Sequence, residues 1–173
     1  MQRVGRGDAL AFRALVDRHA ARPYRVAWRM LGDSGEAEDV AQEAMLRLWR
    51  DGARWDGRGA GVGAWLACVA SRLSIDRLRR RGRTELGEVP ERADEAPRAD
   101  RLIVASEESE RVRRALAALP DRQRAAVVLT YYEELSNAAA AEAMELKLKA
   151  FESMLHRARA ALRTMLIEET VDG

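Results

Sequence analysis

The chain has few cysteines and aromatic residues and no long apolar run, and each shortage excludes a class of protein. Of its 173 residues one is cysteine, so no internal disulfide can form, and Cys68 in the run WLACVA is expected to be a small buried hydrophobe. Aromatic residues make up 5% of the chain. A core built from Leu, Ala, Val and Met favours helices over strands. No apolar run approaches the ~20 residues that a membrane span needs.

Residues that could bind a metal ion or act as nucleophiles are also few, and they lie far apart in the sequence. The two histidines, His19 and His156, lie far in sequence from each other and from Cys68, so neither a metal site nor a nucleophilic enzyme is expected. A loop with several glycines (51–63) lacks the Gly-Lys-Ser/Thr ending of a phosphate cradle, and no strand precedes it. We therefore expect no enzyme activity, no cofactor and no small-molecule substrate. Residues 1–8 are polar and do not resemble a signal peptide, so a cytoplasmic protein is expected.

Charge is nearly balanced overall but unevenly distributed. The net charge is +2, and 28 of the 30 basic residues are arginine. Residues 72–83 and 147–163 are basic, whereas residues 84–110 are acidic. A single charge run is most often a solvated helix face, but two basic runs on helices with apolar faces suit a polyphosphate partner.

Helical periodicity and capping residues predict four helices in the first half. Asp8 caps the first helix, Pro23 lies in the first turn of the second, and Asp33 or Ser34 caps the third. The fourth runs from about 64 to 81. The apolar faces expected for these helices are Phe12, Leu15, Val16 and His19; Val26, Ala27, Met30 and Leu31; Ala37, Val40, Ala41, Ala44, Met45, Leu48 and Trp49; and Trp65, Leu66, Val69, Ala70, Leu73 and Leu78.

The second half predicts four further helices after a flexible acidic linker. The first begins near Ser106, Pro120 starts the second, and Ser136 or Asn137 caps a short third helix. Thr130 and Tyr131 are expected to be available for the core. The last helix runs from about 147 to 166, with the apolar stripe Leu148, Phe151, Leu155, Ala158 and Leu162. The expected fold is therefore all-α, with small helical domains at 1–82 and 106–173 and a linker at 83–105.

Three exposed surfaces are candidates for function. Segments 136–144 and 147–166 form a potential helix-turn-helix, whose last helix presents a mixture of long donors and short polar groups that suits base readout and phosphate contacts. These residues are Lys149, Glu152, Ser153, His156, Arg157 and Arg159. Asp39, Gln42 and Glu43 form a polar face, either solvated or a docking surface. The loop with Trp55 and Arg58 either traps unstacked bases or only connects two helices.

Three segments together resemble the extracytoplasmic-function group of the sigma-70 family of bacterial sigma factors. They are EAEDVAQEAMLRLWR (36–50), GAWLACVASRLSIDRLRRR (63–81) and LPDRQRAAVVLTYYEELSNAAAAEAM with ESMLHRARAALR (within 119–163). The resemblance implies a transcription initiation factor that binds core RNA polymerase, at the β′ clamp helices and the β flap, and directs it to promoter DNA. It also implies that an anti-sigma factor holds the protein inactive.

The same resemblance implies roles for individual residues. Asp39, Gln42 and Glu43 match positions that dock on the clamp helices, and the exposed residues of the last helix match the reader of the −35 element. The −10 reading and melting elements would comprise Arg54, Trp55, Arg58, Trp65, Arg72, Arg77 and Arg80. The loop would capture a flipped base, and the arginine-rich helix would hold the strand backbone.

The chain departs from the family pattern at a few positions. Glu145 stands in the turn of the helix-turn-helix where many relatives have Gly, Lys147 stands where Ser is common, and four alanines (138–141) replace a mixed pattern. Because Gly adopts a left-handed conformation cheaply and Glu does not, the turn is expected to differ or the helices to run on. Arg72 replaces the Asn of many relatives.

Two other classes of function stay open at this point. One is a stand-alone helix-turn-helix DNA-binding regulator, and the other is a helical protein-interaction module without a DNA role. The docking face at Asp39 and the −10-like loop favour the sigma factor over the first alternative. The basic last helix favours it over the second.

Overall fold

The computed structural model describes residues 1–55, 61–84 and 107–171, and these residues form helices. Arg58, residues 85–105 of the expected linker and Ser106, the expected start of the second domain, lie outside this range. The elements in order are η1 (Val4–Arg6), α1 (Ala9–His19), α2 (Ala21–Leu31), α3 (Ser34–Asp51), η2 (Gly52–Arg54), α4 (Gly61–Thr84), α5 (Glu107–Ala118), α6 (Asp121–Val127), the π-helical turn η3 (Val128–Tyr132), α7 (Asn137–Ala143) and α8 (Leu148–Val171). The expected all-α fold is confirmed for the described residues.

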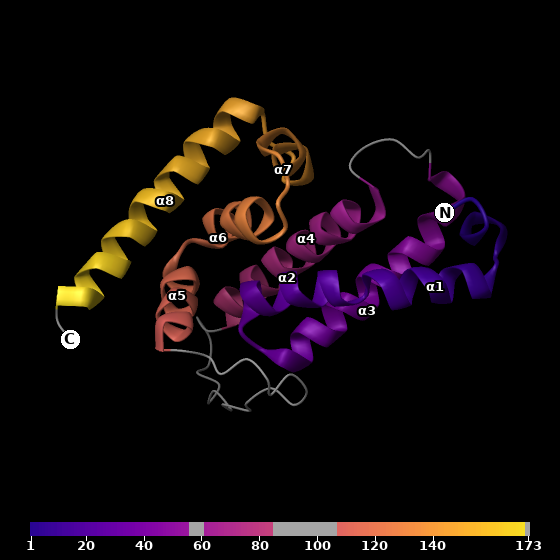
Figure 1. Ribbon diagram of the computed structural model, residues 1–173, viewed down its shortest axis with the longest axis horizontal. Coiled ribbons are helices and arrows are strands. Elements are labelled where there is room, and N and C mark those ends of the chain that lie inside the picture. Colours follow the sequence, from indigo (N-terminus) through magenta and orange to yellow (C-terminus); the bar gives the residue numbers. More distant parts are fainter. Residues whose placement is uncertain (56–60, 85–106, 172–173) are drawn as a thin grey trace.

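The first domain packs α2, α3 and α4 around an aliphatic core (Figure 1). Its helix ends follow the capping residues, since Asp8 accepts a hydrogen bond from Ala11 N and Asp33 accepts one from Glu36 N. Gly32 ends α2 in the left-handed conformation, with φ of 69°. The fully buried side chains include Val26, Met30, Val40, Leu48 and Leu66. This core holds α3 and α4 side by side, with their polar faces toward solvent.

The N-terminal turn η1 packs tightly against η2, which begins the glycine-rich loop. A Cβ atom on Gly5 would lie 2.6 Å from Gly52 O, and one on Gly52 would lie 3.0 Å from Val4 Cγ1. Val4 is buried in this contact. The backbones approach this closely only because both residues are glycine, so the first residues of the chain position the segment that leads to Trp55.

The second domain packs α8 against α5, α6 and α7, and Phe151 of α8 is fully buried. Buried members of this core include Leu116, Leu119, Val127, Val128, Leu129, Ala140, Phe151, Leu155 and Ala158. Ser136 caps α7, accepting a hydrogen bond from Ala139 N at 3.2 Å. Arg124 of α6 is also buried, and its guanidinium donates to Met30 O, Ala117 O and Leu119 O.

The turn between α7 and α8 keeps a tight geometry although it lacks glycine. Glu145 adopts φ of 54°, the left-handed conformation. Leu146 N donates to Ala141 O at 2.9 Å, and Glu145 N donates to Glu142 O at 3.0 Å, which is the Schellman pattern of a helix C-terminus. The expectation that the helices would run on is therefore wrong, because α7 ends at Ala143 and α8 begins at Leu148. The helix-turn-helix is preserved, at the cost of holding a glutamate in a conformation that favours glycine.

The two domains lie against each other, with α6 between α8 and the first domain (Figure 1). Helices α2 and α4 of the first domain contact α5, α6, α7 and η3 of the second. The buried apolar residues of both domains form one contiguous cluster. The polar contacts across this boundary are made mainly by arginines, among them Arg22, Arg72 and Arg124.

Some expected core positions are more exposed than the sequence pattern suggests. Leu148 is 45% exposed and Tyr131 is 51% exposed, so neither belongs to the core. Leu148 is the first residue of α8, and Met154 is buried in the stripe instead. The expected face of α1 is only half-buried, although Phe12 packs edge-on against Trp49 with ring centroids 4.9 Å apart.

Candidate functional site

The outer face of α8 carries all six residues expected to read DNA. Each of them is exposed, whereas Phe151, Met154, Leu155 and Ala158 face the core. The exposed set is Lys149, Glu152, Ser153, His156, Arg157 and Arg159. Because α7 and the tight turn support α8 at its N-terminal end, the structure presents this helix as a helix-turn-helix presents its second helix.

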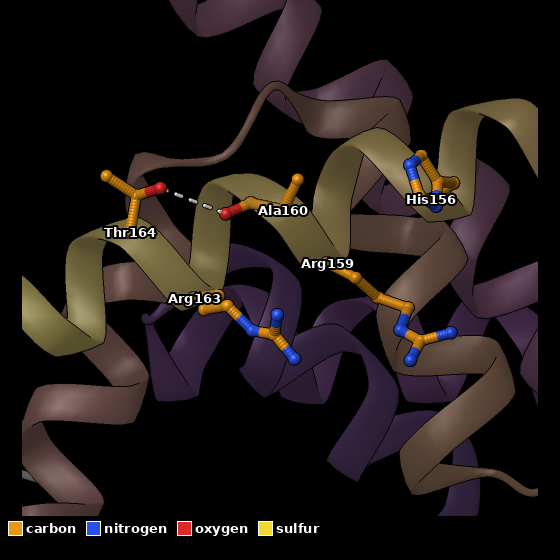
Figure 2. A pocket seen from close by; sticks show the side chains of 5 residues that line it. All are labelled: His156, Arg159, Ala160, Arg163 and Thr164. Atoms are coloured by element: carbon orange, nitrogen blue, oxygen red, sulfur yellow. Dashed lines mark hydrogen bonds between the residues drawn. The ribbon is translucent and has the colours of Figure 1, made fainter.

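A shallow hollow of about 360 Å³ lies along α8, lined by His156, Arg159, Ala160, Arg163 and Thr164. In Figure 2, Arg159 and Arg163 extend from successive turns toward the same side of the helix. Thr164 Oγ1 donates to Ala160 O at 3.2 Å, which keeps the hydroxyl on the helix. Two guanidinium groups and an imidazole beside a hollow suit a phosphate or a base edge. Arg163 was not among the expected site residues, although its spacing of seven from His156 places it on the same face.

The polar face of α3 is exposed as expected. Asp39 and Gln42 are exposed, and Glu43 is half-buried. Glu43 accepts from Arg47 Nη2 at 2.6 Å and lies 3.9 Å from Arg77 Nη2 of α4. The structure thus joins the expected docking face to the arginine-rich helix. Leu46 is 52% exposed one turn further along the face and was missed, although its spacing from Asp39 follows the helical repeat.

The residues expected to bind the −10 element are brought together only in part. Arg54 is exposed at the end of η2, and Arg77 contacts Glu43. Arg80 is exposed on α4. Arg72 Nε donates to Ala143 O at 2.7 Å, and its Nη1 lies 3.2 Å from Glu145 Oε1. Arg72 therefore contacts the second domain.

Two tryptophans frame the glycine-rich loop. Trp55 precedes it and Trp65 follows it in α4, and their rings meet edge-on with centroids 6.1 Å apart. Both side chains are half-buried and pack against the core. Such a pair offers an aromatic surface next to Arg54, which is the combination that single-stranded nucleic acid favours.

Cys68 is partly buried, and its thiol is expected to be weakly reactive. Burial raises the pKa of its thiol to about 11, while Arg72 opposes this and Glu142 of α7 adds to it. The thiolate that would act as a nucleophile or ligand is therefore scarce near neutral pH. In the described parts of the chain, no three His, Cys, Asp or Glu residues are grouped so as to hold a metal ion. None of the described helices is long and apolar enough to cross a membrane.

Comparison with known families matches both domains. The family model of sigma-70 region 2 matches residues 15–84, and that of sigma-70 region 4 matches residues 109–162. The first match covers the end of α1 and all of α2, α3 and α4, and the second covers most of α5, all of α6, η3 and α7, and α8 as far as Leu162. The order of the two regions agrees with the order of the domains in the structure.

Whole-chain comparisons give the same family. The chain is 30% identical to the ECF RNA polymerase sigma factor SigW of Bacillus subtilis over 177 residues, covering 96% of this chain and 94% of SigW. It is 30% identical to SigK of Mycobacterium tuberculosis, covering 96% and 91%. It is 35% identical to SigE of Mycolicibacterium smegmatis, covering 90% of this chain and 62% of SigE.

Solved sigma factor structures share this fold. CnrH in complex with the cytosolic domain of CnrY superposes with a TM-score of 0.69 at 27% identity, covering 96% of this chain and 94% of CnrH. RpoE of Bartonella quintana, in complex with the anti-sigma factor NepR, gives a TM-score of 0.70 at 21% identity, covering 90% and 96%. The chain belongs to the extracytoplasmic-function group of the sigma-70 family, whose members are initiation factors that bind core RNA polymerase and direct it to promoters.

Proposed function

We propose that this sigma factor divides its work between two domains, residues 1–82 and 106–173. The first docks on core polymerase and opens the −10 element, and the second reads the −35 element. The observation that carries this proposal is the chemistry of the exposed faces. The polar, acidic face of α3 and the arginine-rich α4 share one domain, whereas the basic face of α8 lies on the other.

The docking surface comprises Asp39, Gln42 and Glu43, with Leu46 as its apolar member. An exposed leucine beside polar residues suits a protein interface, where apolar contacts carry affinity and polar groups set orientation. The β′ clamp helices are the proposed partner of this surface. We also propose that the second domain contacts the β flap.

The −10 element is proposed to bind at Arg54, Trp55, Arg58, Trp65, Arg72, Arg77 and Arg80. The edge-on pair of Trp55 and Trp65 supports this assignment, because aromatic surfaces stack unpaired bases of any sequence. Arginines along α4 would neutralise phosphates of the opened strand. Unstacking a base costs a few kcal/mol, which these contacts must offset.

The −35 element is proposed to bind Lys149, Glu152, Ser153, His156, Arg157 and Arg159. Their exposure on one helix of a preserved helix-turn-helix supports the proposal. Arg163 extends this surface through the hollow beside Arg159 (Figure 2). Glu152 and Ser153 are short enough to approach base edges while the arginines reach phosphates or guanine.

Replacing Arg157 by alanine is expected to weaken −35 duplex binding by roughly 1–3 kcal/mol, because a base-reading arginine contributes about that much. Binding would be measured by fluorescence anisotropy on a promoter found by transcript mapping. Arg113→Ala, which removes an exposed arginine from α5, is the matched control and should bind as wild type. Equal affinities for the two variants would remove Arg157 from the site.

An anti-sigma factor is a further proposed partner. CnrH, which shares the fold and 27% identity over nearly the whole chain, was solved with the cytosolic domain of CnrY, and RpoE was solved with the anti-sigma factor NepR. We further propose that the chain acts in the cytoplasm with polymerase and has no catalytic activity of its own.

Reconstitution tests the proposed function directly. Purified chain would be added to core polymerase on genomic DNA fragments, and transcript 5′ ends would be mapped with and without it. New starts that share upstream sequence elements are the expected result. DNA binding without any change in transcript starts would instead favour the stand-alone regulator.

A further inference from the structure

The N-terminal turn η1 contacts the chain where it leaves α3 and leads to Trp55. Val4 of η1 is 2% exposed, and a Cβ atom on Gly5 would lie 2.6 Å from Gly52 O and 2.9 Å from Ala53 Cα. In Figure 1 the N-terminus lies beside η2, although the two segments are far apart in the sequence. We call the packing of Val4 and Gly5 against Gly52 and Ala53 the η1–η2 contact.

The carbonyl oxygen at the centre of this contact also binds the backbone of Trp55. Gly52 O accepts a hydrogen bond from Trp55 N at 3.4 Å, which closes η2. A hydrogen bond of this length is weak, so it depends on where the carbonyl group is held. The Trp55 ring in turn meets the Trp65 ring edge-on, with centroids 6.1 Å apart. The position of the Gly52 carbonyl therefore affects where Trp55 lies beside Trp65.

Close packing, rather than backbone conformation, accounts for glycine at positions 5 and 52. Gly52 has φ of −53° and ψ of −36°, which any residue adopts. Gly5 lies in η1 and is not one of the described glycines with a positive φ. An alanine at position 5 would thus suit its own backbone, but its methyl group would press on a main-chain oxygen. That oxygen moves only if the backbone of η2 moves with it.

The turn η1 is itself held against α1 and α3. Arg3 Nε donates to Asp8 Oδ2 at 2.8 Å, and Asp8 caps the first turn of α1. Phe12 of α1 packs edge-on against Trp49, which lies three residues before Gly52. One contact thus ties η1 to α1, and the other ties α1 to the end of α3. Because of both, η1 is a fixed part of the first domain.

We propose that η1 is a positioning element for promoter opening, in which Val4 and Gly5 hold the Gly52 carbonyl so that Trp55 lies beside Trp65, ready to stack an unpaired base. The inference rests on the proposed role of Trp55 at the −10 element. Val4 and Gly5 are positioning residues that act through Trp55 and do not themselves contact DNA. An aromatic surface that is already in place binds a base without first losing conformational freedom.

Gly5→Ala tests the η1–η2 contact without changing the charge of the chain. The added methyl group displaces Gly52 O and, with it, the Trp55 backbone. Loss of one stacked base lowers the affinity for a single strand by roughly 5- to 150-fold, so we expect a loss of about fivefold or more. Val4→Ala removes packing from the same contact and should act in the same direction. Gly82→Ala is the matched control, because a Cβ atom there would meet nothing within 4 Å.

Each variant would be assembled with core polymerase and tested on a promoter found by transcript mapping. Affinity for a fluorescein-labelled single strand with the non-template −10 sequence would be measured by anisotropy. Transcription from the duplex promoter would be compared with transcription from the same promoter carrying a mismatched, already open bubble. Poor base capture should lower transcription from the duplex and spare the bubble, since no base pair has to be opened there. Damage to the fold or to polymerase binding would lower both.

Melting temperature and co-elution with core polymerase check that each variant folds and docks. If Gly5→Ala fails either check, Val4→Ala carries the comparison. Trp55→Ala then shows whether η1 acts through Trp55. On the Trp55→Ala background, Gly5→Ala or Val4→Ala should cause no further loss of strand affinity, because both changes remove the same contact. Losses that multiply in the double variant would show that η1 acts by another route, which overturns the inference.

The outcomes separate this inference from the proposed function. Weaker strand binding and a higher ratio of bubble to duplex transcription, seen for Gly5→Ala and Val4→Ala but not for Gly82→Ala, support the positioning role. If Trp55→Ala weakens strand binding while Gly5→Ala and Val4→Ala bind as wild type, the inference is wrong and the role of Trp55 stands. If Trp55→Ala itself binds as wild type, the role proposed for Trp55 is wrong, and the inference fails with it.

Discussion

Replacing Asp39 and Glu43 together by arginine is expected to abolish binding to core RNA polymerase while the fold stays intact. Both residues lie on the polar face of α3 outside the core, and like charges across an interface cost several kcal/mol, which corresponds to a loss of more than about 100-fold in affinity. Glu43 loses its contacts with Arg47 and Arg77, but both pairs are partly exposed. Unfolding free energy should therefore fall by no more than about 1 kcal/mol.

A matched variant separates a local effect from one of net charge. Asp17→Arg with Asp51→Arg changes the charge equally, and both residues are exposed in the same domain but off the polar face of α3. Co-elution with core polymerase on size exclusion should be lost for the first variant and retained for the second. Loss in both would assign the effect to overall charge, and retention in both would remove the α3 face from the interface.

Replacing Arg124 by methionine is expected to destabilise the chain by about 3 kcal/mol, since several buried carbonyl oxygens lose their partner. The Arg124 guanidinium donates to Met30 O in the last turn of α2 and to Ala117 O and Leu119 O where α5 ends. It thus places a positive charge at the negative ends of two helices. Methionine has a similar length but no donor. The melting temperature should fall by roughly 6–12 °C.

Arg122 supplies the control for this substitution. It lies two residues away on α6, is exposed, and donates to the single carbonyl of Met144 at 3.1 Å. Arg122→Met should cost less than about 1 kcal/mol, because water can replace an exposed donor. Urea unfolding followed by circular dichroism would give both values. Equal stabilities for the two variants would show that the contacts of Arg124 add nothing to the fold.

The helices themselves could be predicted because their ends depend on neighbouring residues. Asp8, Asp33 and Ser136 each accept the hydrogen bond expected of an N-cap, and Gly32 takes the left-handed conformation expected of a helix end. The apolar stripes placed Val26, Leu48 and Phe151 in the core. The exposed residues of α8 could be predicted from its apolar stripe, because positions on the opposite side of the helix must face solvent.

The contacts between the domains could not be predicted in this way. Arg22 and Glu133 are 111 positions apart, and nothing in either segment indicates the other. The sequence around Arg124 does not indicate that this arginine is buried, because burial of a charge depends on which carbonyls the fold places around it. At Glu145 the sequence predicted the wrong local conformation. Glutamate disfavours the left-handed conformation, which argued against a tight turn at this position. The Schellman hydrogen bonds and the contact with Arg72 nevertheless hold Glu145 in that conformation.

Arginine-to-carbonyl bonds recur across the described structure, at Arg22, Arg72, Arg122 and Arg124. A main-chain oxygen carries no titratable proton, so these bonds should survive acidification that neutralises carboxylates. In each bond only the arginine depends on the amino-acid sequence, because every residue carries a main-chain carbonyl. Methods that infer proximity from correlated substitutions between relatives would therefore miss them, even where they decide how the two halves of the molecule meet.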